Sequence, residues 1–347
     1  MQHLPTDHFH SRLATREELQ RLTGNTSFLY NQRVWWEVVE DGLGFESIGI
    51  ITEFDSAPIA MLVYFATRRG PFKLIGSPIR GSMTPYQRPI VFDKFNKDLY
   101  CGLLRSQTEF LRALGYSSIS LGFDSSEPYL THLASDVRGE LVDRNSFIVE
   151  IEPDMEKMWA KMHSRQRNMV RKAQKNHVSV RLLQGSSGEI ATFYDMLSKT
   201  FAKTGNFPPH PLRFYEYCVQ RMRLANQLLF LSAEVEGRTI AMGLFLHDVK
   251  TMYFISATSA ADVSQFAPNN LIQWEVMRLS VEKNLQAYDM CGQGIASIDK
   301  FKQSLGGRVS PQPWIVWRSP TAKIAESAYL KLNRFWARYR IRSTHTP

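Results

Sequence analysis

Helix-like and strand-like segments alternate along the whole chain, and the same alternation runs through it twice. Apolar residues at every second position indicate strands, and apolar residues three and four positions apart indicate helices. The first half has strand-like runs at 47–54, 59–67, 72–77, 117–122 and 146–151 and a long helical run at 94–114. The second half has strand-like runs at 178–183, 227–235, 239–247, 251–258, 286–290 and 309–317 and a helical run at 270–283. This order predicts an α/β protein with mixed sheets, built from two similar units.

The length of the chain agrees with two units, because 347 residues exceed one ordinary domain and accommodate two of about 150 residues. We expect one domain over 1–150, a second over 151–318, and a C-terminal helix over 319–347. No low-complexity linker separates the two halves. We therefore expect them to share a packed interface, the kind of place where ligand clefts tend to form.

The composition excludes several classes of protein. Cys101, Cys218 and Cys291 are far apart and form no Cys-x-x-Cys pair, which argues against a disulfide framework and a zinc ribbon. The N-terminus lacks the apolar core of a signal peptide, and no apolar run is long enough to span a membrane. Phosphate-loop, dinucleotide, nucleophile-elbow and zinc-protease motifs are absent. We expect a cytoplasmic protein with no bound metal and no permanently bound cofactor.

Positive charge is concentrated in two segments of a chain whose 42 basic and 33 acidic residues leave a net charge of +9. The segment 157–181 contains eight Lys or Arg residues and no acid, and its apolar residues have helical spacing. A solvated helix face normally mixes both signs, so this one favours a polyanionic ligand. We predict that Arg165, Arg167 and Arg171 bind phosphate; a solvated face is the alternative.

The second basic segment is a predicted amphipathic helix over 322–342, with an apolar and aromatic stripe and basic residues mostly off it. Such a helix either lies on an anionic membrane surface or packs on the protein by its stripe. A third basic group, Arg68, Arg69 and Arg80, surrounds glycine- and proline-containing turns in the first half. These three arginines form either a loop that binds the acceptor substrate or a solvated loop.

Three motifs in the second half resemble one known family. They are Arg167-Asn-Met-Val-Arg-Lys-Ala-Gln-Lys175, then Ala267-Pro-Asn-Asn-Leu-Ile-Gln-Trp-Glu275 followed by Tyr288-Asp-Met-Cys-Gly292, and Asp299-Lys-Phe-Lys-Gln-Ser-Leu-Gly-Gly307. Their order and spacing are similar to those of the FemAB-like N-acyltransferases, including the BioF2-like (CelD-like) branch. The chain departs from the family pattern at His177, Cys291 and Leu305. The resemblance is clear over about 155–317 and holds only as a pattern over 28–150.

The resemblance implies two tandem GNAT-like (acyl-CoA N-acyltransferase) domains and an acyl-transfer activity without metal. It also implies that Lys300, Phe301 and Lys302 contact the acyl donor. In an extended segment, the two lysines would share one face and Phe301 the other. Lysine can hold phosphate or polarise a carbonyl oxygen during acyl transfer. An exposed lysine pair beside a turn is the alternative reading. We predict that Lys302 and Asp289 are catalytic, with Asp289 orienting the acceptor amine or acting as a base; a carboxylate that only fixes its loop is the alternative.

These observations predict an N-acyltransferase that acts on an amine of a cell-envelope glycan or peptidoglycan-type precursor. Its co-substrate is an acyl-CoA-like thioester, or alternatively an aminoacyl-tRNA, as in the peptidoglycan-bridge aminoacyltransferases of the family. The expected partners are a small-molecule or lipid-linked acceptor, with tRNA and a membrane surface contacted through 322–342 as further candidates. Two alternatives of other classes are a non-catalytic RNA-binding protein on the same scaffold and a peripheral membrane scaffold.

Overall fold

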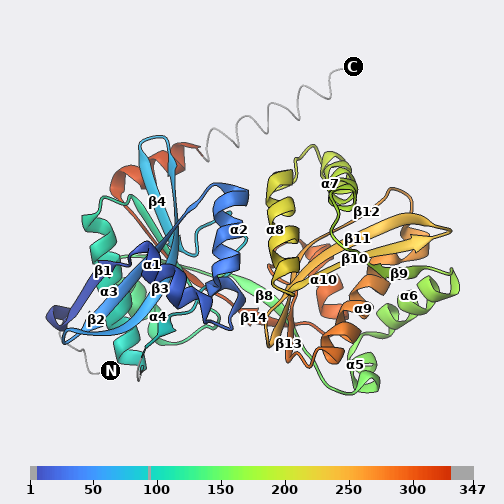
Figure 1. Ribbon diagram of the computed structural model, residues 1–347, viewed down its shortest axis with the longest axis horizontal. Helices are drawn as coiled ribbons and strands as arrows, with labels where there is room; N and C mark the ends of the chain where they lie inside the picture. The colour runs from blue at the N-terminus through green and yellow to red at the C-terminus, as the bar shows by residue number, and fades with distance from the viewer. Residues whose placement is uncertain (1–5, 93–94, 330–347) are drawn as a thin grey trace.

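The computed structural model describes residues 6–92 and 95–329, which form two mixed sheets lying side by side (Figure 1). The first sheet has the strand order β1-β2-β3-β4-β6-β15-β7, and β5 pairs with β3. The second has the order β14-β8-β13-β12-β11-β10-β9. Helices pack against both sheets, so the predicted α/β class with two similar mixed units is confirmed.

The first unit follows the predicted order closely. Its strands are β1 (Phe9–Leu13), β2 (Glu46–Phe54), β3 (Ala57–Arg69), β4 (Phe72–Ser77), β5 (Ile90–Val91), β6 (Ser118–Gly122) and β7 (Glu140–Val142). Its helices are α1 (Arg16–Gly24), α2 (Arg33–Leu43), α3 (Lys97–Ala113) and α4 (Tyr129–Asp136), with short 3-10 turns η1 (Thr6–His8) and η2 (Leu29–Asn31). Local signals begin two of these helices: a capping box of Thr15 and Glu18 precedes α1, and the Asn96 side chain caps α3.

The second unit repeats this theme. Its strands are β8 (Asn145–Glu150), β9 (Ser179–Leu182), β10 (Leu228–Val235), β11 (Arg238–His247), β12 (Thr251–Ser259), β13 (Ala287–Asp289) and β14 (Arg308–Pro311). Its helices are α5 (Met155–Lys161), α6 (Ser164–Lys175), α7 (Ser187–Ala202), α8 (Leu212–Leu224), α9 (Pro268–Glu282) and α10 (Ala296–Ser304), with a 3-10 turn η3 (Ser264–Phe266). The predicted hairpin and the strand after it are confirmed as β10, β11 and β12.

Two strands lie in the sheet opposite to the one that their place in the sequence suggests. The predicted strand 146–151 does not close the first sheet, because β8 pairs with β13 and β14 of the second. The predicted strand 309–317 is two strands: β14 stays in the second sheet, whereas β15 (Trp314–Arg318) pairs with β6 and β7 of the first. Pro311 and Pro313 lack the backbone N–H that a continuous ladder needs, and the chain crosses between the sheets there. The sheets therefore do not divide at residue 150.

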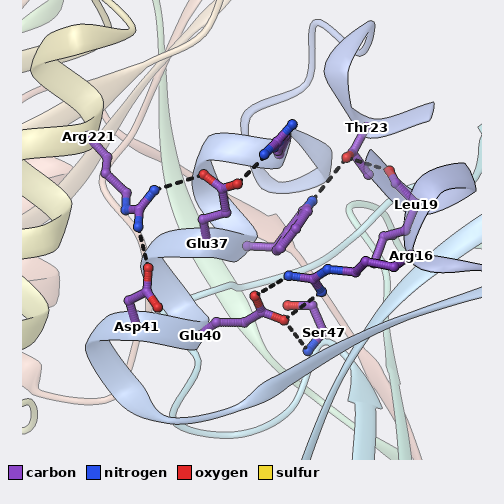
Figure 2. Close-up of polar contacts among 10 residues, drawn as sticks. Arg16, Leu19, Thr23, Glu37, Glu40, Asp41, Ser47 and Arg221 are labelled. Carbon is purple, nitrogen blue, oxygen red and sulfur yellow. Dashed lines mark hydrogen bonds and ion pairs between the residues drawn. The ribbon is translucent and has the colours of Figure 1, made fainter. Parts of the chain in front are cut away.

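The predicted interface between the halves is formed largely by α2 and α8. These helices approach closely, since a Cβ at Gly42 would lie 2.9 Å from the Cα of Phe214. One buried apolar cluster contains residues of both helices, and Arg221 of α8 forms ion pairs with Glu37, at 2.9 Å, and with Asp41 of α2 (Figure 2). On the same junction, Leu29 donates its backbone N–H to the buried Asp248 carboxylate at 3.1 Å.

The spacing of the basic segment 157–181 predicts one helix. The structure instead has two short helices, α5 and α6, followed by strand β9. Helix α5 stops before Met162, and α6 begins after His163, whose ring nitrogen accepts from the Arg165 backbone N–H. Arg167 donates to the Met162 carbonyl at 2.6 Å and so satisfies the open end of α5. The side chains of His163 and Arg167 therefore cap the adjoining ends of α5 and α6 and separate them into two helices. The apolar residues keep their helical spacing across this break, so the sequence pattern does not reveal it.

The predicted C-terminal helix falls partly outside the described residues, which end at 329. Residues 320–329 are helical; Ala322 is buried, whereas Ile324 and Tyr329 are exposed. Within the described part of the chain, no helix combines the length and the apolar character needed to cross a bilayer. Contact of 322–342 with a membrane surface and a cytoplasmic location stay predictions.

Candidate active site at the junction of the two sheets

Strands β12 and β13 form a parallel pair that separates at the junction between the two halves. They pair from Thr251 and Ala287 to Tyr253 and Asp289, and residues 254–259 of β12 then continue without β13. Asp289 therefore ends β13 at the point where the two strands part. A strand end of this kind is a common place for a ligand in α/β sheets.

The Asp289 carboxylate is fully buried and receives three hydrogen bonds. The Ser146 hydroxyl and the Cys291 backbone N–H, at 2.8 Å, donate to Oδ1, and the Gln312 amide donates to Oδ2 at 3.2 Å. Burial raises the pKa of Asp289, while these bonds lower it. The bond to Cys291 fixes the turn that follows β13, so the loop-fixing role has direct geometric support. Contact of Asp289 with an acceptor amine stays a prediction.

Lys302 lies beside this turn, on helix α10 and not in the extended segment that we expect from its motif. Its ammonium donates to the backbone carbonyls of Cys291 and of Gly292, the latter at 2.7 Å. Burial lowers the pKa of Lys302. An ammonium has three donors, so one N–H remains for a further acceptor at the surface of the site. The structure thus brings the two predicted catalytic residues together around one turn.

The helical conformation separates Lys300 from Lys302. Two residues apart on a helix are about 200° apart around its axis, so the shared face expected of an extended segment is wrong. Lys300 is exposed, and Phe301 packs against the core of the second unit. A Cβ at Gly307 would lie 2.7 Å from the Lys302 carbonyl oxygen, so the glycine lets the chain after α10 pass close to the lysine. Donor contacts of Lys300 and Phe301 stay predictions.

The cations of the basic segment divide into paired and unpaired ones. Lys161 pairs with Glu152 at 2.8 Å, and Arg181 pairs with Glu234 at 3.0 Å. Arg167 is used at the end of α5, and Arg171 lies over the Trp159 ring at 5.2 Å. Six cations have no ion pair with a carboxylate among residues 6–92 and 95–329: Lys157, Arg165, Arg167, Arg171, Lys172 and Lys175. The segment contains no acid, but acids from other parts of the chain neutralise two of its eight cations. Phosphate binding by the segment stays a prediction.

Helix α6 begins beside the end of the helix that carries Lys302. The Gln166 amide donates to the Ser304 hydroxyl at 2.6 Å, and the His163 backbone N–H donates to the Ser304 carbonyl at 2.8 Å. Gln166 also accepts from the Asn270 amide, at the start of α9. One buried glutamine therefore joins three helices, and it places the unpaired cations of α6 near the candidate site.

The three arginines of the predicted acceptor loop do not lie together. Arg68 and Arg69 are exposed at the tip of the β3–β4 hairpin, where Lys73 and Phe72 are their partners in the strand register. Arg80 follows the opposite end of β4. Six strand residues span about 20 Å, so this strand keeps Arg80 away from the other two. The loop that carries Arg80 contacts Trp314 of β15, whose indole N–H donates to the Pro85 carbonyl at 2.9 Å.

The first sheet has a parallel pair of its own, β4 and β6, but its loop closes the space beyond it. Ser120 of β6 donates to the Pro78 carbonyl at 2.6 Å, and Ser77 donates to Gln87 at 3.0 Å, both being buried. The loop 78–87 thus folds back over the strand ends. The two units share an architecture but differ beyond their parallel pairs. In the first unit the loop 78–87 covers the strand ends, whereas in the second unit Lys302 of α10 lies beside the end of β13.

Comparison with known proteins agrees with this geometry. A family model described as an acetyltransferase (GNAT) domain matches residues 160–303. FemX superposes with a TM-score of 0.69 at 13% identity, over 88% of this chain and 96% of FemX. L-PGS from Bacillus licheniformis has a TM-score of 0.56 at 9% identity, over 93% and 97% of the two chains. A tandem GNAT protein from the clavulanic acid biosynthesis pathway has a TM-score of 0.55 at 9% identity, over 89% and 98%. No curated protein sequence matches.

Residues 160–303 form a GNAT acyltransferase domain, and the chain as a whole has the double-GNAT fold of FemX and of the tandem GNAT protein. The resemblance seen in the sequence motifs is therefore confirmed at the level of the fold. The low identities leave the acyl donor and the acceptor to be argued from the site itself.

A buried tyrosine of the first unit reaches across to the site of this acyltransferase. Tyr30, in η2, stacks edge-on against Tyr253 of β12 with ring centroids 4.9 Å apart. Its side chain is fully buried, and its hydroxyl has no hydrogen-bond partner among residues 6–92 and 95–329. Burial raises the pKa of Tyr30 well above its usual value, and the nearby Asp289 carboxylate adds to the shift. A protonated donor without a partner in the described part of the chain therefore lies near the turn after β13.

Replacing Tyr30 with phenylalanine tests whether that hydroxyl contributes to the stability of the folded protein. We expect the free energy of unfolding to stay the same or rise by up to about 1 kcal/mol, because a buried donor without a partner is unfavourable. Urea unfolding of Tyr30→Phe measures this. A loss of more than about 1 kcal/mol would contradict an unpartnered hydroxyl and would indicate a buried bridging water.

Sequence reasoning missed Ser146, Gln312 and Tyr30, although all three surround Asp289 or its turn. Gln312 stands between two prolines, a pattern that indicates a chain crossing but not its destination. Ser146 begins a strand that was assigned to the other sheet, and Tyr30 lies in a short turn without any motif. Their roles depend on which segments meet, and no local pattern contains that information.

Proposed function

We propose that this acyltransferase moves an acyl group from an acyl thioester of the CoA type to an amine of a cell-envelope glycan or peptidoglycan-type precursor. The observation that carries the proposal is the ammonium of Lys302, held on two carbonyls of the turn after β13 with one donor left over. A cation fixed at a strand end can stabilise an oxyanion without reorganisation during the reaction.

The reaction needs little from the protein beyond placement and charge stabilisation, because a thioester is already activated. The acceptor nitrogen attacks the thioester carbonyl carbon, and the carbonyl oxygen becomes an oxyanion beside Lys302. The C–S bond then breaks, and the thiolate takes up the proton that the nitrogen loses. An α-amine, with a pKa of about 7.7–8.0, needs less deprotonation than a lysine amine of about 10.4. Asp289 contributes by fixing the turn whose carbonyls hold Lys302.

The donor phosphates are proposed to bind the unpaired cations along α6, including Arg165 near its start and Arg171 in its second half. These cations suit CoA phosphates and the backbone of a tRNA alike, so an aminoacyl-tRNA is the second candidate donor. The start of α6 contacts the end of α10, the helix that carries Lys302, and this contact supports the proposal. The contacts between these helices support a donor that runs from α6 to the turn after β13.

A donor panel with a matched pair of variants tests the proposal. Thiol release from acetyl-, succinyl- and longer acyl-CoA is followed with amino sugars and muramyl peptides as acceptors, and labelled aminoacyl-tRNA is offered in parallel. We expect amine-dependent thiol release, lost in Lys302→Ala and kept in Gln303→Ala, whose side chain is exposed on the same helix. Transfer from aminoacyl-tRNA alone would replace the thioester by the tRNA donor. RNA binding without any transfer, unchanged in Lys302→Ala, would favour the non-catalytic alternative.

A further inference from the structure

Three cations gather at the tip of the β3–β4 hairpin in the first unit. Arg68 stands directly opposite Lys73 in the strand register, and Arg69 follows Arg68 at the tip. Like charges placed opposite each other on two strands destabilise the pair, and an anion at the tip removes this repulsion. Within the described part of the chain, no carboxylate forms an ion pair with any of the three, although Glu46 begins the neighbouring strand β2. The tip therefore carries open positive charge.

Backbone hydrogen bonds join this hairpin to the last described helix. The Ser117 N–H donates to the Lys73 carbonyl at 2.8 Å, and the Ser319 N–H donates to the Ser117 carbonyl at 2.8 Å. The helical residues 320–329 begin directly after Ser319, and Figure 1 shows them, in red, beside β4. Lys323 of this helix is exposed and forms no ion pair with a carboxylate of the described residues. Two segments that are distant in the sequence thus bring four cations to one part of the surface.

The same helix presents apolar side chains to solvent. Ala322 is buried, whereas Ile324 is 71% exposed and Tyr329 is 59% exposed. Glu326, the acid of this helix, pairs with Arg318 at 2.6 Å, so its charge is already balanced. The sequence left two alternatives for the apolar stripe of this segment, packing on the protein or contact with a membrane. In the described turns, the isoleucine and the tyrosine of that stripe do not pack on the protein.

We infer that the hairpin and the helix form one surface that docks on a bilayer containing anionic lipids. This hairpin–helix surface consists of Arg68, Arg69, Lys73, Lys323, Ile324 and Tyr329. The surface potential of an anionic leaflet attracts the cations, and the apolar side chains beside them enter the boundary between headgroups and acyl chains. An RNA backbone would neutralise the cations but would leave the isoleucine in water, so its exposure favours a bilayer. The inference is independent of the proposed function, because it depends on neither the donor nor the acceptor.

Flotation of the full chain with lipid vesicles tests the hairpin–helix surface. One set of vesicles contains phosphatidylcholine alone, and the other contains phosphatidylcholine with phosphatidylglycerol, each at low and at high salt. We expect binding to the anionic vesicles that weakens at high salt, and an affinity for the neutral vesicles that is lower by about tenfold or more. Absence of binding to the anionic vesicles, or equal binding to both kinds, would overturn the inference.

Two variants separate the contributions of charge and of apolar contact. The double variant Arg68→Gln/Arg69→Gln is expected to lower the affinity for anionic vesicles about tenfold and to reduce its dependence on salt. Ile324→Ser is expected to lower the affinity about fivefold and to leave the dependence on salt unchanged. All three side chains are exposed, so the urea midpoint of both variants should equal that of the unmodified protein. A full affinity in both variants would overturn the inference.

Matched control variants lie in the second unit. Arg238→Gln/Lys250→Gln removes two exposed cations near the ends of β11, and Leu224→Ser replaces a leucine that is 83% exposed. Each control is expected to keep the affinity within about twofold, because attraction to the leaflet falls off within a Debye length. Equal losses in the controls would assign binding to net charge and overturn the inference. Binding of an RNA oligonucleotide through Arg68 and Arg69, without vesicle binding, would also overturn it.

Discussion

Replacing Lys302 with alanine is expected to lower kcat about 100- to 1,000-fold, the usual effect of removing one oxyanion donor. The fold should persist, because Lys302 contacts carbonyl groups of a surface turn and no buried acid depends on it. Gln303→Ala, exposed on the same helix, is the control and should keep kcat within about twofold of the unmodified protein. Single-turnover assays at saturating thioester measure the chemical step. A Lys302→Ala enzyme of full activity would remove the observation on which the proposed function depends.

The charge of Lys302 also predicts a pH dependence. Burial lowers its pKa, so the ammonium loses its proton at a lower pH than an exposed lysine does. Because oxyanion stabilisation requires the charged form, kcat should fall as the pH rises through this lowered pKa. In Lys302→Arg, whose guanidinium stays charged, the fall should move to higher pH or disappear. An alkaline limb identical in the two proteins would assign it to another group.

Replacing Asp289 with alanine is expected to cost at least about 3 kcal/mol of stability and nearly all activity. The substitution leaves the Ser146 hydroxyl, the Cys291 N–H and the Gln312 amide without their acceptor in a buried place. Asp289→Asn is the informative partner, since its amide oxygen can accept two of these bonds and its amide nitrogen can face a turned-over Gln312. A loop-fixing role predicts that Asp289→Asn keeps kcat within about tenfold. Loss of activity with an intact fold would support the role in orienting the amine or as a base.

The difference in stability between Asp289→Asn and the unmodified protein should depend on pH. The pKa of Asp289 is raised in the folded protein, so its charged form opposes folding above that pKa. This penalty decreases as the pH falls from the raised value toward that of the unfolded chain, and the asparagine variant has no such penalty. Asp289→Asn should therefore be at least as stable as the unmodified protein at neutral pH, with a difference that shrinks on acidification. Urea unfolding at several pH values measures it; a difference that grows toward acid pH would contradict the burial of a charged carboxylate.

Most of the elements were predictable because their signals are local. The strand over 72–77 is β4 with the same bounds, and the helix expected over 94–114 is α3, started by the Asn96 cap. The Lys300–Lys302 segment was expected to be extended and is helical. Its nine-residue helix is short and follows a glycine-containing loop, so packing of Phe301 on the core decides its conformation where the sequence period alone does not.

The sequence by itself determined the class of the fold, its two similar halves, and the strand that ends near Asp289, whereas only the structure brings Lys302 to the turn after that strand. Apolar periodicity shows which face of a segment is buried, and for that reason it predicts elements well. Only the tertiary structure decided that β8 and β15 lie in each other's expected sheet, that Tyr30 packs on Tyr253 and Gln312 reaches Asp289, and that β4 keeps Arg80 apart from Arg68. These features depend on which distant segments meet, because burial is shared between segments and no single segment specifies its partner.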